Sequence, residues 1–102
     1  MADRYVVGKE ARHDLDAILV YLAEASGSVD QAFAVDAKLH EAFDFVAHNP
    51  GVGHTRSDLG IPEQFRVWPV YSYLVIYNPA ARPVRILRVW HGAQEKPEIP
   101  EP

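Results

Sequence analysis

The chain has 102 residues and no cysteine, with 10 Lys and Arg residues against 14 Asp and Glu residues. This length fits one domain with its own core, and the lack of cysteine excludes a disulfide framework and thiolate zinc sites. No apolar run is long enough for a signal peptide or a membrane span. We therefore predict a small cytoplasmic protein without a membrane segment, and a net acidic charge is atypical of a free-standing nucleic-acid binder.

The charge is unevenly distributed along the chain. Residues 1–50 carry four basic and nine acidic residues, whereas residues 51–92 carry five arginines and only two acidic residues. Such asymmetry indicates a partner-binding face more than a uniform surface.

The first half predicts a strand followed by a helical hairpin. Residues 4–7 are β-prone, and residues 9–25 place apolar side chains three or four positions apart. Ser28 has capping-box spacing to Gln31 and begins a second helix that runs to residue 48. The apolar face expected for that helix consists of Phe33, Leu39, Ala42, Phe43 and Val46.

The second half predicts a polar loop over residues 51–63 and then three strands. Residues 65–70, 73–77 and 84–91 are rich in β-branched and aromatic side chains, and their links are short enough for hairpins. An antiparallel meander with two helices on one face is an α+β two-layer domain. We expect one domain over residues 1–95 and a flexible, proline-containing tail over residues 96–102.

His91, at the end of the last predicted strand, is a candidate acid or base near neutral pH. The alternative is a partly exposed structural histidine. The five histidines show no metal-ligand spacing, and no serine lies in a nucleophile motif, so we expect neither a metal site nor a nucleophilic triad.

Arginines form the second candidate group, with Arg56 in the loop and Arg66, Arg85 and Arg88 on strands. Strict alternation places Arg85 on one sheet face with Leu87, Val89 and His91, and Arg88 on the other with Ile86 and Trp90. The forked guanidinium group of arginine binds phosphate or carboxylate, so both a nucleic-acid backbone and an acidic peptide remain candidate partners of these arginines. A solvated face with cross-strand ion pairs is the third interpretation.

Aromatic side chains are concentrated on the predicted sheet. Stacking of nucleic-acid bases is one interpretation, and a core or a partner groove is the other, since sheets favour aromatic residues in any case. These residues are Phe65, Trp68, Tyr71, Tyr73, Tyr77 and Trp90.

The order of these features resembles the RelE/ParE superfamily of bacterial type II toxins, and within it the ParE branch, over residues 4 to about 95. The residues that carry the resemblance are Ala11-x-x-Asp14-Leu15-x-x-Ile18-x-x-Tyr21-Leu22-Ala23-Glu24, Asn49-Pro50-Gly51-x-Gly53, Asp58-Leu59, Phe65-Arg66-x-x-Pro69-Val70, Tyr73-Leu74-Val75-Ile76-Tyr77 and Ile86-Leu87-Arg88-Val89-Trp90-His91-Gly92-Ala93.

The resemblance implies a RelE-like fold with the element order β-α-α-β-β-β. It also implies a toxin that inhibits growth and serves plasmid stabilisation. ParE-like toxins poison DNA gyrase without cofactors and are neutralised by a ParD-like ribbon-helix-helix antitoxin. The tail of that antitoxin packs a helix and an extended segment on the toxin, and operator DNA is bound through the antitoxin. A hetero-oligomeric complex is therefore expected.

The sister RelE branch consists of ribosome-dependent mRNA endonucleases, and that activity is the alternative function. The resemblance assigns Arg66, Arg88 and His91 to catalysis in that case. However, Leu74 stands where the nucleases keep an arginine, and Trp68 where a second lysine would be useful. A binding protein without catalytic residues is therefore the preferred interpretation, and an inert relic of a toxin operon is a third.

Two sets of binding residues follow from the resemblance. An acidic antitoxin tail is expected to meet the arginines of the last strand, while Arg56, Arg66 and His91 are assigned to the cellular target. The antitoxin-binding set is Leu19, Leu22, Phe33, Trp68, Tyr73, Arg85, Arg88 and Trp90.

Overall fold

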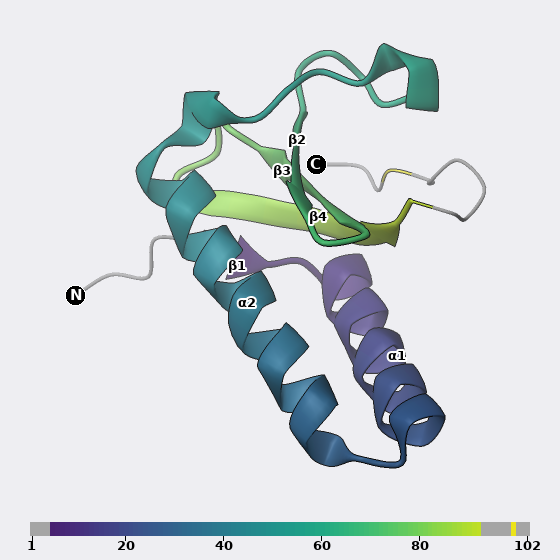
Figure 1. The fold of residues 1–102 in the computed structure, drawn as a ribbon. Coiled ribbons are helices and arrows are strands. Elements are labelled where there is room, and N and C mark those ends of the chain that lie inside the picture. Colours follow the sequence, from purple (N-terminus) through teal and green to yellow (C-terminus); the bar gives the residue numbers. More distant parts are fainter. Residues whose placement is uncertain (1–4, 93–98, 100–102) are drawn as a thin grey trace.

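A computed structural model of the chain describes residues 5–92 and Ile99, and in it a helical hairpin covers one face of a four-stranded sheet (Figure 1). The strands β1 (Tyr5–Val7), β2 (Arg66–Val70), β3 (Tyr73–Asn78) and β4 (Val84–His91) lie in the order β1-β4-β3-β2. Only β1 and β4 pair in parallel; the other two pairs are antiparallel. The predicted α+β class and element order are confirmed.

The hairpin consists of α1 (Lys9–Ser26) and α2 (Val29–His48). Gly27, with a φ of 68°, adopts the left-handed conformation that ends α1. Ser28 caps α2, but its hydroxyl accepts the Asp30 N–H at 3.2 Å rather than that of Gln31. Neither helix has the length and apolar character needed to cross a membrane, within the part of the chain that the structure describes.

The main core lies between the hairpin and the sheet. It joins Ala11 and Leu15 of α1 to the inward faces of α2 and the three longer strands. Phe33 was expected on the apolar face of α2, but its side chain is 66% exposed, because the buried face of the helix runs through Ala32 and Val35 instead. The remaining core residues are Leu39, Phe43, Val46, Tyr73, Val75, Tyr77, Val84, Ile86 and Val89.

A second apolar cluster lies on the sheet face away from the helices. Figure 1 shows the segment between α2 and β2 passing on that side, with the short helices η1 (Pro50–Val52) and η2 (Ser57–Leu59). The loop predicted over residues 51–63 is present, but it is not polar throughout, because Ile61 is buried in this cluster. Its buried members are Ile61, Phe65, Val67, Ile76 and Leu87, and Leu59, Leu74, Trp90 and Ile99 pack against them.

The face assignment within β4 needs correction at Leu87. Tyr77 of β3 lies opposite Ile86, whereas the preceding Ile76 lies opposite Arg88, so Leu87 is an extra residue in the ladder. Val89 therefore belongs to the helix-facing core like Ile86, and Arg85 does not share its face. Strict alternation failed because a bulge shifts every following side chain to the other face.

The predicted tail, residues 96–102, lies outside the described residues apart from Ile99. The proposed domain boundary at residue 95 therefore stays a prediction.

Candidate functional site

Asp14 of α1 binds Arg88 of β4 in a forked ion pair. The Arg88 Nε and Nη2 atoms donate to the two carboxylate oxygens at 2.7 and 2.9 Å, and both side chains are only 16% exposed. The same carboxylate accepts the Val89 N–H at 3.0 Å. The short strand β1 pairs with β4 only as far as Ile86. The Val89 N–H therefore lies on an edge of β4 without a neighbouring strand, and the Asp14 carboxylate accepts its hydrogen bond instead.

The Arg88 charge is therefore already compensated within the chain. Its guanidinium carbon also lies 5.3 Å from the ring centre of Trp90, a cation–π distance. Arg88 anchors α1 to the sheet, whichever partner it meets in addition.

A buried tyrosine explains the Asn49-Pro50-Gly51-x-Gly53 motif. The Tyr77 hydroxyl donates to the Pro50 carbonyl at 2.7 Å and accepts the Gly53 N–H at 2.9 Å. Arg66 donates from Nη1 to the Gly53 carbonyl at 3.0 Å. Burial raises the pKa of Tyr77 above its ordinary value, and the Gly53 hydrogen bond and the Arg66 charge only partly oppose this.

Arg66 of β2 and His91 of β4 lie on either side of β3 and near its opposite ends. Arg66 pairs with Tyr77 and His91 pairs with Tyr73, which places them about 13 Å apart along the strand. Arg88 lies opposite Ile76, a residue of the second apolar cluster, and binds Asp14. The structure therefore does not bring the three residues of the nuclease alternative together.

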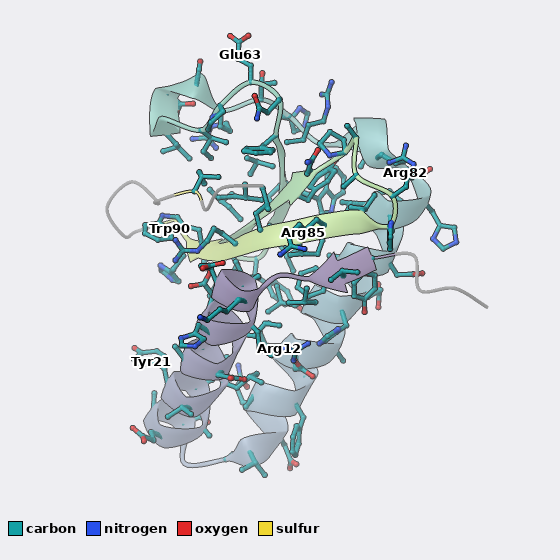
Figure 2. All side chains as sticks on the ribbon, turned by 180° about the vertical axis from the view of Figure 1, so that it is seen from behind. Arg12, Tyr21, Glu63, Arg82, Arg85 and Trp90 are labelled. Carbon is teal, nitrogen blue, oxygen red and sulfur yellow. The ribbon has the colours of Figure 1, made fainter. Side chains whose placement is uncertain are left out.

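His91 lines a pocket of about 430 Å³ between α1 and the end of the sheet. Its ring packs edge-on against Tyr73, with the ring centres 5.3 Å apart. Burial raises the pKa of Tyr73, and the neighbouring Tyr21 adds to the effect. Figure 2 shows Tyr21 projecting outward from α1, and its side chain is 68% exposed.

The residues expected to bind the antitoxin do not form one surface, because they lie on both faces of the sheet. Leu22 and Tyr73 pack in or against the main core, whereas Trp90 packs against the second apolar cluster. Arg85 is exposed on β4 between the core residues Val84 and Ile86, and Figure 2 shows Arg85 and Trp90 at separate positions along that strand. Of the others, Leu19 is partly exposed, Phe33 is exposed and Trp68 lies beside α2.

Arg56, assigned to the target, forms a forked pair with Asp58, both bonds being 2.9 Å. This hydrogen bonding raises the pKa of Arg56. The pair lies in the loop around η2. Because Arg66 and His91 lie about 13 Å apart along β3, the three target residues form no single cluster.

A groove between α2 and β2 was not predicted from the sequence. Its volume is about 860 Å³, and it contains an aromatic pair, Phe45 and Trp68, with ring centres 5.2 Å apart. Phe45 is 42% exposed and lies off the buried stripe of α2. An aromatic residue on the polar side of an amphipathic helix is the signal that would have indicated this groove.

Within the described residues no group of three or more His, Cys, Asp or Glu side chains is placed to hold a metal ion. The described residues form a small α+β scaffold with hollows beside α1 and α2 and with partly exposed aromatic side chains.

Comparison with known families assigns the chain to a family. The family model described as the ParE toxin of the type II toxin–antitoxin system, parDE, matches residues 5–96. The chain therefore belongs to the ParE toxin family, and the predicted resemblance is confirmed. No curated protein was found to match the chain.

Proposed function

We propose that this toxin stops growth by binding DNA gyrase and trapping it on cleaved DNA. The observation that carries the proposal is the separation of Arg66 and His91 at the two ends of β3, with Arg88 held by Asp14. Cleavage of RNA needs a base, an acid and a phosphate clamp around one phosphate. Their dispersal supports a binding mechanism over a catalytic one.

The partner that we propose is a ParD-like antitoxin with a ribbon-helix-helix domain. Membership of the parDE family implies an antitoxin encoded with the toxin, and the exposed aromatic residues and grooves suit a tail that folds on binding. The resulting hetero-oligomer would bind operator DNA through the antitoxin, act in the cytoplasm and serve plasmid stabilisation.

A supercoiling assay with purified toxin and gyrase tests the proposal. Toxin is expected to inhibit supercoiling, and the antitoxin of the same operon is expected to restore it. Unchanged supercoiling at a large excess of toxin would reject gyrase as the target.

The mRNA endonuclease alternative is tested with the same protein preparation on translating ribosomes. It predicts cut messages, and no cutting after Arg66→Ala or His91→Ala. Messages that stay intact with the unaltered toxin rule this activity out.

A further inference from the structure

Four basic side chains surround the strand β1 and the start of α1. They come from the first turn of α1, from the loop between β3 and β4, and from β4 itself. All four side chains are exposed, and none forms an ion pair with a described residue. This set, called the basic patch below, consists of Lys9, Arg12, Arg82 and Arg85.

Backbone contacts bring Arg85 and the start of α1 together. Arg85 pairs with Val6 of β1, and its Nε and Nη2 atoms lie 3.6 Å from the place that a Cβ atom on Gly8 would take. Lys9 follows Gly8 directly, and Arg12 donates its backbone N–H to the Gly8 carbonyl at 2.9 Å. Since Lys9 and Arg12 are three positions apart, they lie on the same face of α1. The basic residues of β4 and α1 therefore flank one glycine.

Arg82 lies in the loop that joins β3 to β4, three residues before Arg85. Its Nη1 atom donates to the carbonyls of Pro79 and Ala81 at 2.6 and 2.7 Å. Both acceptors are neutral, so the loop holds the guanidinium group without compensating its charge. Figure 2 shows Arg85 between Arg12 and Arg82 on one side of the molecule.

The basic patch fits a polyanion better than the surface of a folded protein. Val6, which pairs with Arg85, is a small apolar side chain that is 41% exposed. None of the four basic residues lines either of the two hollows described above. Protein interfaces depend on large anchors that fill pockets, whereas a phosphate backbone requires only cations within reach of its phosphates. Guanidinium groups match phosphate oxygens in both charge and geometry.

The charge of the whole chain opposes DNA binding by the toxin alone. The net charge is −4, and duplex DNA carries one negative charge per about 1.7 Å of its axis. Repulsion between the two weakens their association at a distance. The basic patch therefore becomes effective when another protein holds DNA beside it.

We propose that the basic patch contacts the phosphate backbone of the DNA duplex that gyrase holds, so that the toxin binds enzyme and DNA together. The inference rests on the proposed gyrase target and adds DNA as a direct contact of the toxin. It assigns Arg85 to phosphates in place of the acidic antitoxin tail, while Arg88 stays bound to Asp14. Phosphate contacts carry no base information, so the contact is independent of DNA sequence.

Fluorescence anisotropy of labelled toxin tests the proposal by measuring its affinity for gyrase with and without a linear DNA duplex. DNA is expected to tighten binding of the unaltered toxin about tenfold. Arg85→Glu and Lys9→Glu should each lose most of this gain, while their affinity for DNA-free gyrase stays within about twofold of that of the unaltered toxin, because phosphate contacts act only on DNA. Lys38→Glu, an equal charge change at an exposed position of α2, should keep the gain. Thermal unfolding of each free variant establishes that it is folded.

The salt dependence of the DNA-dependent affinity counts the phosphate contacts. Each contact adds about 0.9 to the magnitude of the slope of log affinity against log salt concentration. Arg85→Gln should therefore reduce this magnitude by about one, whereas Lys38→Gln should leave it unchanged. An equal slope for Arg85→Gln and the unaltered toxin would contradict the phosphate contact.

No gain from DNA in the unaltered toxin, or an equal gain in every variant, would overturn the inference. Three other results would also overturn it. Weaker binding of Arg85→Glu to DNA-free gyrase would assign the basic patch to gyrase itself, weaker binding to the antitoxin alone would assign it to the acidic tail, and weaker binding to ribosomes alone would assign it to RNA. In all these cases the unaltered toxin still binds gyrase, and the proposed function stands. That function fails separately, if the unaltered toxin binds gyrase neither with nor without DNA.

Discussion

Gly53 occupies a position with no room for a side chain. A Cβ atom there would lie 2.6 Å from the Tyr77 hydroxyl and 2.9 Å from the Val67 carbonyl oxygen. Both neighbours are fixed, the first by its two hydrogen bonds and the second by the bridge to His54. The glycine of this family motif therefore serves the fold and needs no role in target binding.

Gly53→Ala is expected to lower the free energy of unfolding by about 1–3 kcal/mol, because the added methyl group must displace the Tyr77 hydroxyl or β2. Urea denaturation measures the change. Gly51→Ala is the matched control, since a Cβ atom at Gly51 meets nothing within 4 Å. Equal stability of the two variants would contradict the packing described for Gly53.

Tyr77→Phe is expected to cost about 1–3 kcal/mol, because it leaves the Gly53 N–H and the Pro50 carbonyl without their partner. The exposed Tyr71 provides the control, and Tyr71→Phe should change stability by less than about 0.5 kcal/mol. Urea denaturation at neutral pH compares the two.

The raised pKa of Tyr77 adds a pH dependence. The folded state favours the neutral phenol, so this stabilisation is present below the unfolded pKa of about 10 and is lost as the pH rises through the folded pKa. Stability above about pH 10 should therefore fall less steeply in Tyr77→Phe than in the unaltered toxin. A residual slope is expected from Tyr73, whose pKa is also raised; identical slopes would contradict the assignment.

At the scale of elements, the two long strand edges are protected in different ways. The β2 edge is blocked by His54 and Pro69, whereas the β4 edge beyond β1 is covered by Asp14 at the Val89 amide. Unprotected edges invite strand addition and aggregation. The same contacts prevent a partner protein from adding a strand to the sheet, so they favour binding through side chains in a groove.

Asp14→Ala is expected to destabilise the toxin by about 2 kcal/mol, because it removes the forked Arg88 pair and the acceptor of the Val89 N–H. Partial exposure of the pair lets water compensate some of the loss. Asp16→Ala, at an exposed position of the same helix, should change stability by less than about 0.5 kcal/mol. If chemical denaturation finds the two variants alike, Asp14 does not anchor α1.

At the scale of the whole molecule, local signals were enough for the order of elements. Gly27 and Ser28 mark the turn of the hairpin, and β-branched runs mark the three later strands, so these elements could be predicted within about one residue. The bulge at Leu87 could not be predicted in this way, because it arises from pairing between strands and leaves no pattern within one strand.

The candidate site was harder to predict than the fold. Residue type drew attention to Arg66, Arg88 and His91, but only the strand register reveals that they lie apart. The groove residue Phe45 comes from α2 and its partner Trp68 from β2, so their contact depends on the packing of helix against sheet. Side chains that meet across elements are invisible to periodicity within one element.

We propose that the toxin acts by holding gyrase on cleaved DNA and not by cutting RNA. Covalent gyrase–DNA complexes, isolated from cells expressing the toxin without its antitoxin, test this most directly. These complexes are expected to accumulate as growth stops and to disappear when the antitoxin is co-expressed. Growth arrest without any increase in gyrase-linked DNA would contradict it.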